Sequence, residues 1–260
     1  MSTRFQKIIS GLFLVSAASL LFAGCSLYPT TTVNVTPSAA PTAAMMANKV
    51  DLQFGNHPGM KLPEQDVFVM GPVASEVWRL EAVDALKPEN MKKMVYSTAA
   101  MTPHDPFKIG ARPLGPFAKG ASLGFTLDDW LAASGSGTYS WEGDKAQLNL
   151  SFTKLVPNAT YTVWCSRLTF PPNPKIVDSP CGAADGSENT FKTDPSGNGS
   201  FMLSLKPLEE STKETATVIA VAYHRDGKTY GAEPGDFGKV THVQIVALIP
   251  VPTATSTVSK

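Results

Sequence analysis

The sequence predicts a mainly β fold, with an antiparallel β-sandwich of about seven strands in residues 137–249. Apolar and polar residues alternate within short segments, as in 147–152, where every second residue is apolar. Clusters of Gly, Pro, Asn and Asp, such as 194–199, separate these segments every ten or so residues. No helix of α/β spacing lies between them, which disfavours a parallel sheet. These three observations together indicate an antiparallel sandwich.

Each predicted strand is short and bounded by turn residues. The strands are expected at residues 137–141, 147–152, 161–165, 189–192, 200–205, 218–223 and 243–249. The last two segments are more continuously apolar than the others. Turn chemistry is clearest at Glu142-Gly143-Asp144, at Val156-Pro157-Asn158 and at Arg225-Asp226-Gly227.

Residues 49–136 precede the sandwich and are expected to pack on it as an elaboration with short helices and long loops. Ala74 to Leu86 has loose helical spacing, and Pro88 could open a second short helix. Thr126 and Asp129 have the spacing of a capping box that starts a helix carrying Trp130. Four prolines between Met101 and Gly124 favour extended loop there.

The first 24 residues have the order of a secretory leader. Arg4 and Lys7 are followed by an uncharged apolar stretch over 8–22, and small residues then precede Cys25. The apolar stretch is short for a stable membrane span, which needs about 20 apolar residues. Residues 1–24 are therefore expected to be a cleaved signal peptide.

The tetrad Phe22-Ala23-Gly24-Cys25 resembles the lipobox of bacterial lipoproteins, with Phe22 where Leu is usual. The resemblance implies that Cys25 carries a diacylglycerol and a further acyl chain such as palmitate. The mature chain would then be anchored in a membrane on the extracytoplasmic side of the cell envelope. The alternative is an ordinary secretory leader, in which Cys25 has no lipid.

Two segments have a composition that is not expected to form a core. Residues 25–48 are rich in Thr, Ala, Pro and Ser and are expected to be a flexible tether, and residues 250–260 a disordered tail.

The whole chain has 22 basic and 22 acidic residues and no basic block, so nucleic acid is an unexpected partner. The hydrophobic fraction of 43% is sufficient for a real core.

Cys165 and Cys181 are the two cysteines that remain besides Cys25. In an oxidising compartment such a pair is most simply a disulfide. It would close a loop of about 15 residues and contribute roughly 3 kcal/mol. A two-thiolate metal site is the alternative, although the pair lacks C-x-x-C spacing.

Two longer stretches carry a resemblance in the C-terminal half. Phe125 to Tyr139 and Leu155 to Cys165 look like parts of uncharacterised bacterial extracytoplasmic lipoproteins. The phrase Leu-x-Pro-Asn-x-x-Tyr-x-x-x-Trp within 155–165 also resembles a strand–turn–strand of immunoglobulin-like and fibronectin-like sandwiches. The resemblance implies an immunoglobulin-like fold and no particular activity.

Two histidines suggest an alternative function. His224 ends one predicted strand and His242 begins the last one, so antiparallel pairing would place their rings across the ladder from each other. Such a pair could bind Cu(II) or Zn(II). The further donors in reach would be Tyr223, Asp226, Tyr230 and Met202. Otherwise each histidine hydrogen-bonds a turn carbonyl at a sheet edge.

A formal G-x-S-x-G match occurs at Gly120-Ala121-Ser122-Leu123-Gly124. A nucleophile elbow needs a strand before the serine and a helix after it, above a parallel sheet. The proline-rich context argues against a hydrolase at Ser122, so an enzyme is not expected.

The preferred interpretation is a lipid-anchored, non-enzymatic binding or structural β-sandwich without a cofactor. Its working surface is expected at the loops of one sandwich end, the Cys165–Cys181 excursion and the Arg225–Lys239 loop. Tyr223, Asp226 and Tyr230 are the candidate binding residues there. The copper- or zinc-binding protein is the alternative.

Overall fold

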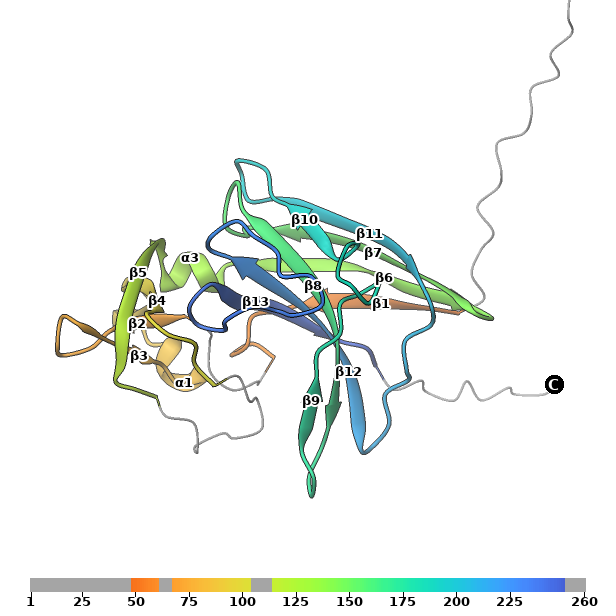
Figure 1. Cartoon of the computed structure of the whole chain (residues 1–260), viewed down its shortest axis with the longest axis horizontal. Coiled ribbons are helices and arrows are strands. Elements are labelled where there is room, and N and C mark those ends of the chain that lie inside the picture. The colour runs from red at the N-terminus through yellow and green to blue at the C-terminus, as the bar shows by residue number, and fades with distance from the viewer. Residues whose placement is uncertain (1–47, 61–66, 104–113, 251–260) are drawn as a thin grey trace, which may run out of the picture. The chain divides into compact units, whose positions relative to one another are not determined.

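Two antiparallel sheets form the larger part of the fold (Figure 1). The computed structural model describes residues 48–60, 67–103 and 114–250. The first sheet has the order β1-β6-β7-β11, with bounds Asn48–Phe54, Ser134–Glu142, Lys145–Thr153 and Gly199–Leu205. The second sheet has the order β10-β8-β12-β13, with β9 beside β8. Its strands are β8 (Thr160–Thr169), β9 (Lys175–Val177), β10 (Thr190–Lys192), β12 (Thr215–His224) and β13 (Thr241–Leu248).

The fold is mainly β, with 49% strand and 7% helix, and its antiparallel sheets confirm the predicted sandwich. All seven strands predicted after residue 136 are present, and β9 is an additional short strand. The pattern of β7 shows why the prediction succeeds, since Ala146, Leu148, Leu150 and Phe152 point inward and every residue between them is exposed.

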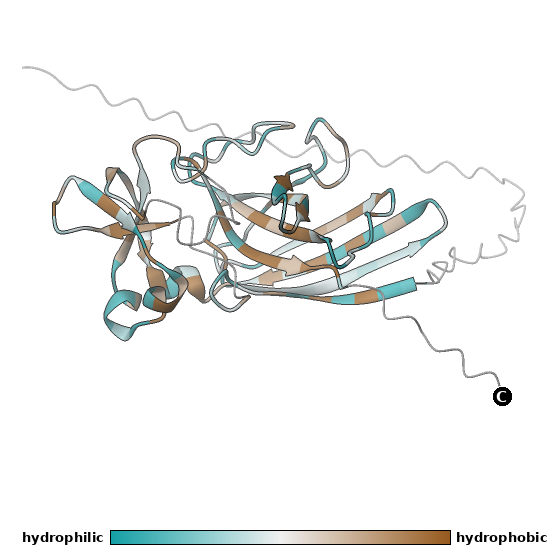
Figure 2. Cartoon of the chain, turned by 90° about the horizontal axis from the view of Figure 1, so that it is seen from below, coloured by the Kyte–Doolittle hydropathy of each residue, from teal (hydrophilic) through white to brown (hydrophobic). Residues whose placement is uncertain are grey.

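Strands β8, β12 and β13 of the second sheet are buried on both faces. Every residue of β12 after Thr215 is buried, which matches its continuous apolar sequence. Its inner face joins the main core between the sheets, whereas Trp164, Val218 and Val246 belong to a separate cluster on the outer face. Figure 2 shows the apolar stretches along the strands.

Residues 49–136 contain more strand than the sequence predicts. β2 (Phe68–Met70), β3 (Glu76–Arg79), β5 (Phe117–Thr126) and β4 (Met94–Thr98) form a small closed barrel in that order, with α1 (Ala82–Ala85), α2 (Pro88–Met91) and α3 (Leu127–Leu131) beside these strands in sequence. The predicted helix over 74–86 is wrong in its first part, because tertiary pairing with β2 and β5 holds 76–79 as β3. The predicted loop through Gly124 is also wrong, because β5 starts directly after Pro116 and runs past Gly124.

The sandwich boundary also differs from the prediction. β1 pairs with β6 along its whole length and is thus the first strand of the sandwich, although it was expected in the elaboration. Leu52 and Phe54 are its buried residues, and two positions are too few to reveal a strand by periodicity. Gly55 continues from β1 and bridges to Val246 of β13, on the other sheet.

The capping box is confirmed at α3. The Asp129 backbone N–H donates to the Thr126 hydroxyl at 3.2 Å, and the Thr126 backbone N–H donates to the Asp129 carboxylate at 2.9 Å. The Thr126 N–H and the Thr126 hydroxyl both donate to the Asp129 carboxylate and thereby lower the pKa of Asp129. Within the described part of the chain, no helix has the length and apolar character needed to cross a membrane.

Candidate functional site

A disulfide joins β8 to the segment that follows β9. Cys165 and Cys181 are bonded, with their Cα atoms 5.0 Å apart, as the sequence predicts. The Cys165 N–H donates to the Ser179 carbonyl at 2.8 Å, and the Cys181 N–H donates to the Val163 carbonyl at 3.1 Å. The returning segment is therefore held against β8 by covalent and backbone bonds.

A groove of about 760 Å³ lies beside this disulfide. We call it the disulfide groove, and its lining comprises Cys165 to Arg167, Val177, Ser179 to Ala183, Glu188, Ser204 to Glu209 and Thr217. β11 is an edge strand of its sheet, and its inward-facing Leu203 and Leu205 are only half-buried. The groove thus lies where the edges of the two sheets separate.

Arg167 forms a rigid wall of the disulfide groove. Its guanidinium Nε lies 3.3 Å from the Glu209 carboxylate, and Nη1 donates to the Thr217 hydroxyl at 2.7 Å. Arg167 Nη2 also donates to the Thr215 hydroxyl. Because its hydrogen-bonding groups are engaged by the protein, Arg167 fixes the shape of the groove.

A smaller hollow of about 280 Å³ adjoins the groove and shares Pro207, Leu208 and Glu209 with it. We call it the Trp141 hollow; it is lined by Asn48 to Val50, Tyr139, Trp141, Pro207 to Glu210, Ile249 and Pro250. The rings of Tyr139 and Trp141 are stacked with centroids 5.1 Å apart. The Leu208 N–H donates to the Tyr139 hydroxyl at 2.7 Å, and burial raises the pKa of this phenol.

The two histidines do not form a shared site. His224 lies opposite Thr241 in the ladder, and His242 lies opposite Tyr223. Directly opposed residues point to the same face, so these neighbouring pairs point to opposite faces. The predicted Cu(II) or Zn(II) pair is therefore wrong by one position of register. Across the described segments, no group of three or more His, Cys, Asp or Glu side chains could hold a metal ion.

His224 is instead part of a hydrogen-bonded chain on the outer face. The Thr241 hydroxyl donates to the Pro234 carbonyl at 2.6 Å, so it can only accept from His224 Nδ1, which is 3.4 Å away. His224 Nε2 then accepts from the Thr162 hydroxyl at 2.7 Å. The Thr162 oxygen also accepts the indole N–H of Trp164 at 2.8 Å. This arrangement suits a neutral imidazole, in keeping with the lowered pKa of His224.

Stability is expected to fall as the pH falls from about 6.5 to 4. Burial lowers the pKa of His224 from 6.5 to about 4, with His242 adding to the shift and Asp226 opposing it. In this interval the unfolded chain binds a proton that the folded chain does not, so the free energy of unfolding decreases on acidification. The loss is roughly 3 kcal/mol at most.

Urea unfolding between pH 7 and pH 4 measures this dependence. His224→Gln should flatten the curve over that interval, whereas Gln147→Ala, which removes an exposed side chain without a titratable group, is the control and should keep the wild-type slope. An unchanged slope in His224→Gln would contradict the prediction.

The three predicted binding residues have different environments. Tyr223 is buried in the core, between the rings of Tyr161 and Trp130, and is not a surface residue. Tyr230 is 37% exposed and donates to the Asp226 carboxylate at 2.7 Å. Burial and this hydrogen bond raise the pKa of Tyr230 to about 12.

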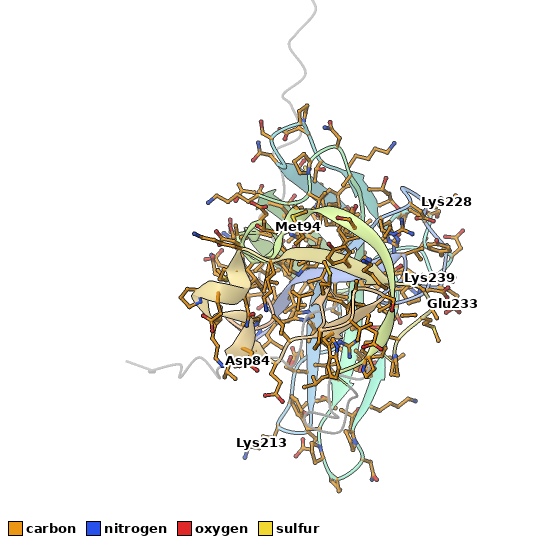
Figure 3. All side chains as sticks on the ribbon, turned by 90° about the vertical axis from the view of Figure 1, so that its left-hand side faces the viewer. Asp84, Met94, Lys213, Lys228, Glu233 and Lys239 are labelled. Atoms are coloured by element: carbon orange, nitrogen blue, oxygen red, sulfur yellow. A yellow bond between two sulfur atoms is a disulfide. The ribbon has the colours of Figure 1, made fainter. Side chains whose placement is uncertain are left out.

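The predicted working surface is divided between two ends of the second sheet. β8 and β12 pair from Thr160 opposite His224 at one end to Thr169 opposite Thr215 at the other. The Arg225–Lys239 loop extends from the first end, and the hairpin between β8 and β9 extends from the second. Figure 3 shows Lys228, Glu233 and Lys239 of the Arg225–Lys239 loop on one side of the molecule.

The remaining predicted residues are not brought together. Ser122 lies within β5 on an exposed position, and its hydroxyl accepts the Gly124 N–H at 3.3 Å, so it has no nucleophile-elbow geometry. Met202 is 78% exposed on β11. Cys25, the tether before Asn48 and the tail after Pro250 lie outside the described residues.

Sequence reasoning missed both hollows. No motif marks Trp141, Arg167 or the 206–210 connection. The signal that could have found the disulfide groove was the predicted Cys165–Cys181 bond, because it holds the segment after β9 against β8. No family model matches the chain, and neither the curated proteins nor the solved structures include a match.

Proposed function

We propose that this chain is a lipid-anchored protein of the cell envelope that acts as a non-enzymatic binding module. Acyl chains on Cys25 would attach it to a membrane, and the sandwich would face the extracytoplasmic side. The leader order of residues 1–24 supports the anchor. The Cys165–Cys181 disulfide is in keeping with an oxidising compartment.

The observation that carries the binding role is the disulfide groove. Its volume of about 760 Å³ falls in the range of ligand sites, roughly 300–1,000 Å³. Its walls are held by the disulfide and by the hydrogen bonds of Arg167, so a ligand would meet a preformed surface. Half-buried Leu205 and Leu208 provide apolar area in it, and Lys206 is exposed at its rim.

Lipid attachment is tested by labelled palmitate in growing cells. The wild-type chain should incorporate the label, whereas Cys25→Ser should not, because a thioether-linked lipid needs the Cys25 thiol. Cys165→Ala/Cys181→Ala is the control for loss of other thiols and should remain labelled. Equal labelling of Cys25→Ser would contradict the anchor.

The groove is tested in the same cells by a photo-crosslinking residue at Val177, which lines the groove and is 44% exposed. The matched control is Met202, which is 78% exposed but lies outside the lining. A discrete adduct at 177 and none at 202 is expected. The same adducts at both positions, or none at 177, would overturn the groove as the ligand surface.

A further inference from the structure

We infer that the Trp141 hollow binds a neutral saccharide. This inference rests on the proposed binding role, and it names the ligand class of a hollow that shares Pro207, Leu208 and Glu209 with the disulfide groove. Three features of the hollow carry it: an aromatic platform, an amide and a carboxylate beside the platform, and a small volume.

The platform is the partly exposed ring of Trp141. The Tyr139 ring stacks on it at 20° between planes, and Tyr139 is itself held by the Leu208 N–H. The indole is thus fixed in orientation before any ligand arrives. The face of an aromatic ring is electron-rich, and the C–H groups of a pyranose, which are weakly positive, stack on such a face.

The polar groups beside the platform are few. The Lys49 side chain points to the other face of β1, beside Asp51, because side chains alternate along the strand and Val50 faces the core. Asn48 contributes an amide and Glu210 a carboxylate. Sugar hydroxyls both donate and accept, so they can pair with all of these groups. The volume of about 280 Å³ is small and suits a sugar unit better than a folded partner.

The charge balance favours a neutral ligand over an ion. The Lys49 ammonium lies 3.4 Å from the Asp51 carboxylate, and the Glu209 carboxylate lies 3.3 Å from Arg167 Nε. With Lys49 and Glu209 paired in this way, Glu210 is the remaining charged residue of the lining. Its carboxylate would repel an anion, and a single carboxylate is too few ligands for a metal cation, whereas a sugar hydroxyl can donate to it. The hollow is accordingly assigned to saccharides without a formal charge.

The test is calorimetric titration of the full chain, purified in a detergent that contains no sugar. Chitohexaose, cellohexaose and maltohexaose are the probes. At least one should bind, with an affinity that changes less than twofold between low and high salt, because screening acts on charged ligands. No binding of any of the three would overturn the inference.

Variants then locate the site. Trp141→Ala should weaken binding at least tenfold, on the order expected for an aromatic hot spot, and Trp141→Phe should weaken it less. Tyr230→Ala, which removes a partly exposed ring outside the hollow, is the control and should bind as the wild type does. Equal affinity in Trp141→Ala would overturn the assignment.

Glu210 distinguishes a sugar from a cation. Glu210→Gln keeps a hydrogen-bonding group and should change the affinity for the bound hexasaccharide by less than threefold, whereas Glu210→Ala should weaken it more. Tetramethylammonium chloride, titrated as a cationic probe, should not bind. If it binds and Glu210→Gln abolishes that binding, the hollow is a cation site and the saccharide assignment is wrong. The palmitate and crosslinking results are independent of these titrations, so either proposal can fail alone.

Discussion

Replacement of Trp130 by alanine is expected to lower the free energy of unfolding by about 3–5 kcal/mol. Trp130 in α3 is fully buried, with its ring stacked on Phe125 at 5.8 Å and edge-on to Tyr223 at 6.3 Å. Its carbonyl accepts from the Gln244 side-chain amide at 3.1 Å. The alanine variant leaves a cavity between β5 of the barrel and β12 of the sandwich, which two rigid elements cannot close.

Urea unfolding at pH 7 measures this effect. Trp141→Ala is the matched control, because it removes the same side chain from a partly exposed position, and it should cost less than half as much. Trp130→Phe should lie between the wild type and Trp130→Ala. A loss below about 1 kcal/mol in Trp130→Ala would contradict the role of Trp130 as the central packing residue of this junction.

Loss of the disulfide is expected to cost roughly 3 kcal/mol. The bond closes a loop between residues 16 positions apart, and without it the unfolded chain regains conformational freedom. The strip from Ser179 to Cys181 would then be held against β8 by backbone hydrogen bonds alone. The wall of the disulfide groove should loosen together with the fall in stability.

The measurement compares urea midpoints with and without a reductant. The midpoint of the wild-type chain should drop on reduction, and the midpoint of Cys165→Ala/Cys181→Ala should be low in both conditions. Cys25→Ser is the control for the third thiol and should respond to the reductant as the wild type does. Insensitivity of the wild type would show that the bond contributes no stability.

The sandwich strands could be predicted because their burial is local and periodic. In β7 every second residue is apolar and buried, so the sequence alone reveals both the strand and its inward face. The helix start at Thr126 is equally local, since the capping box involves residues only three positions apart. Such features depend on neighbours in sequence and hold in almost any tertiary context.

The barrel strands could not be predicted in this way. Val77 and Arg79 of β3 are buried by pairing with β2 and β5, which lie elsewhere in the chain. Arg79 in particular is 1% exposed and lies over the ring of Phe68 at 5.2 Å, a position that its charge would not suggest. Cation–π contact with aromatic rings from other strands makes such burial tolerable.

In the candidate site, too, some features could be predicted from the sequence and others depend on strands that are distant in sequence. The cysteine pairing was predicted from the cysteine count and from the expected oxidising compartment, whereas the groove beside it depends on how far β11 lies from the segment Ser179 to Cys181. The prediction that His224 and His242 lie opposite each other was wrong by one residue of register. The Arg225 N–H donates to the Val240 carbonyl, which sets Thr241 opposite His224. A shift of one residue moves a side chain to the other face of a sheet.

By itself, the sequence determined the antiparallel sandwich, its seven C-terminal strands, the α3 cap and the Cys165–Cys181 bond. Each depends on local periodicity, on short-range hydrogen bonding or, for the bond, on Cys165 and Cys181 being the two cysteines other than Cys25. Only the tertiary structure decided the barrel, the opposite facing of His224 and His242, and the hollows around Arg167 and Trp141. Those features arise from the register and separation of strands that are distant in sequence, and no local pattern encodes such distances.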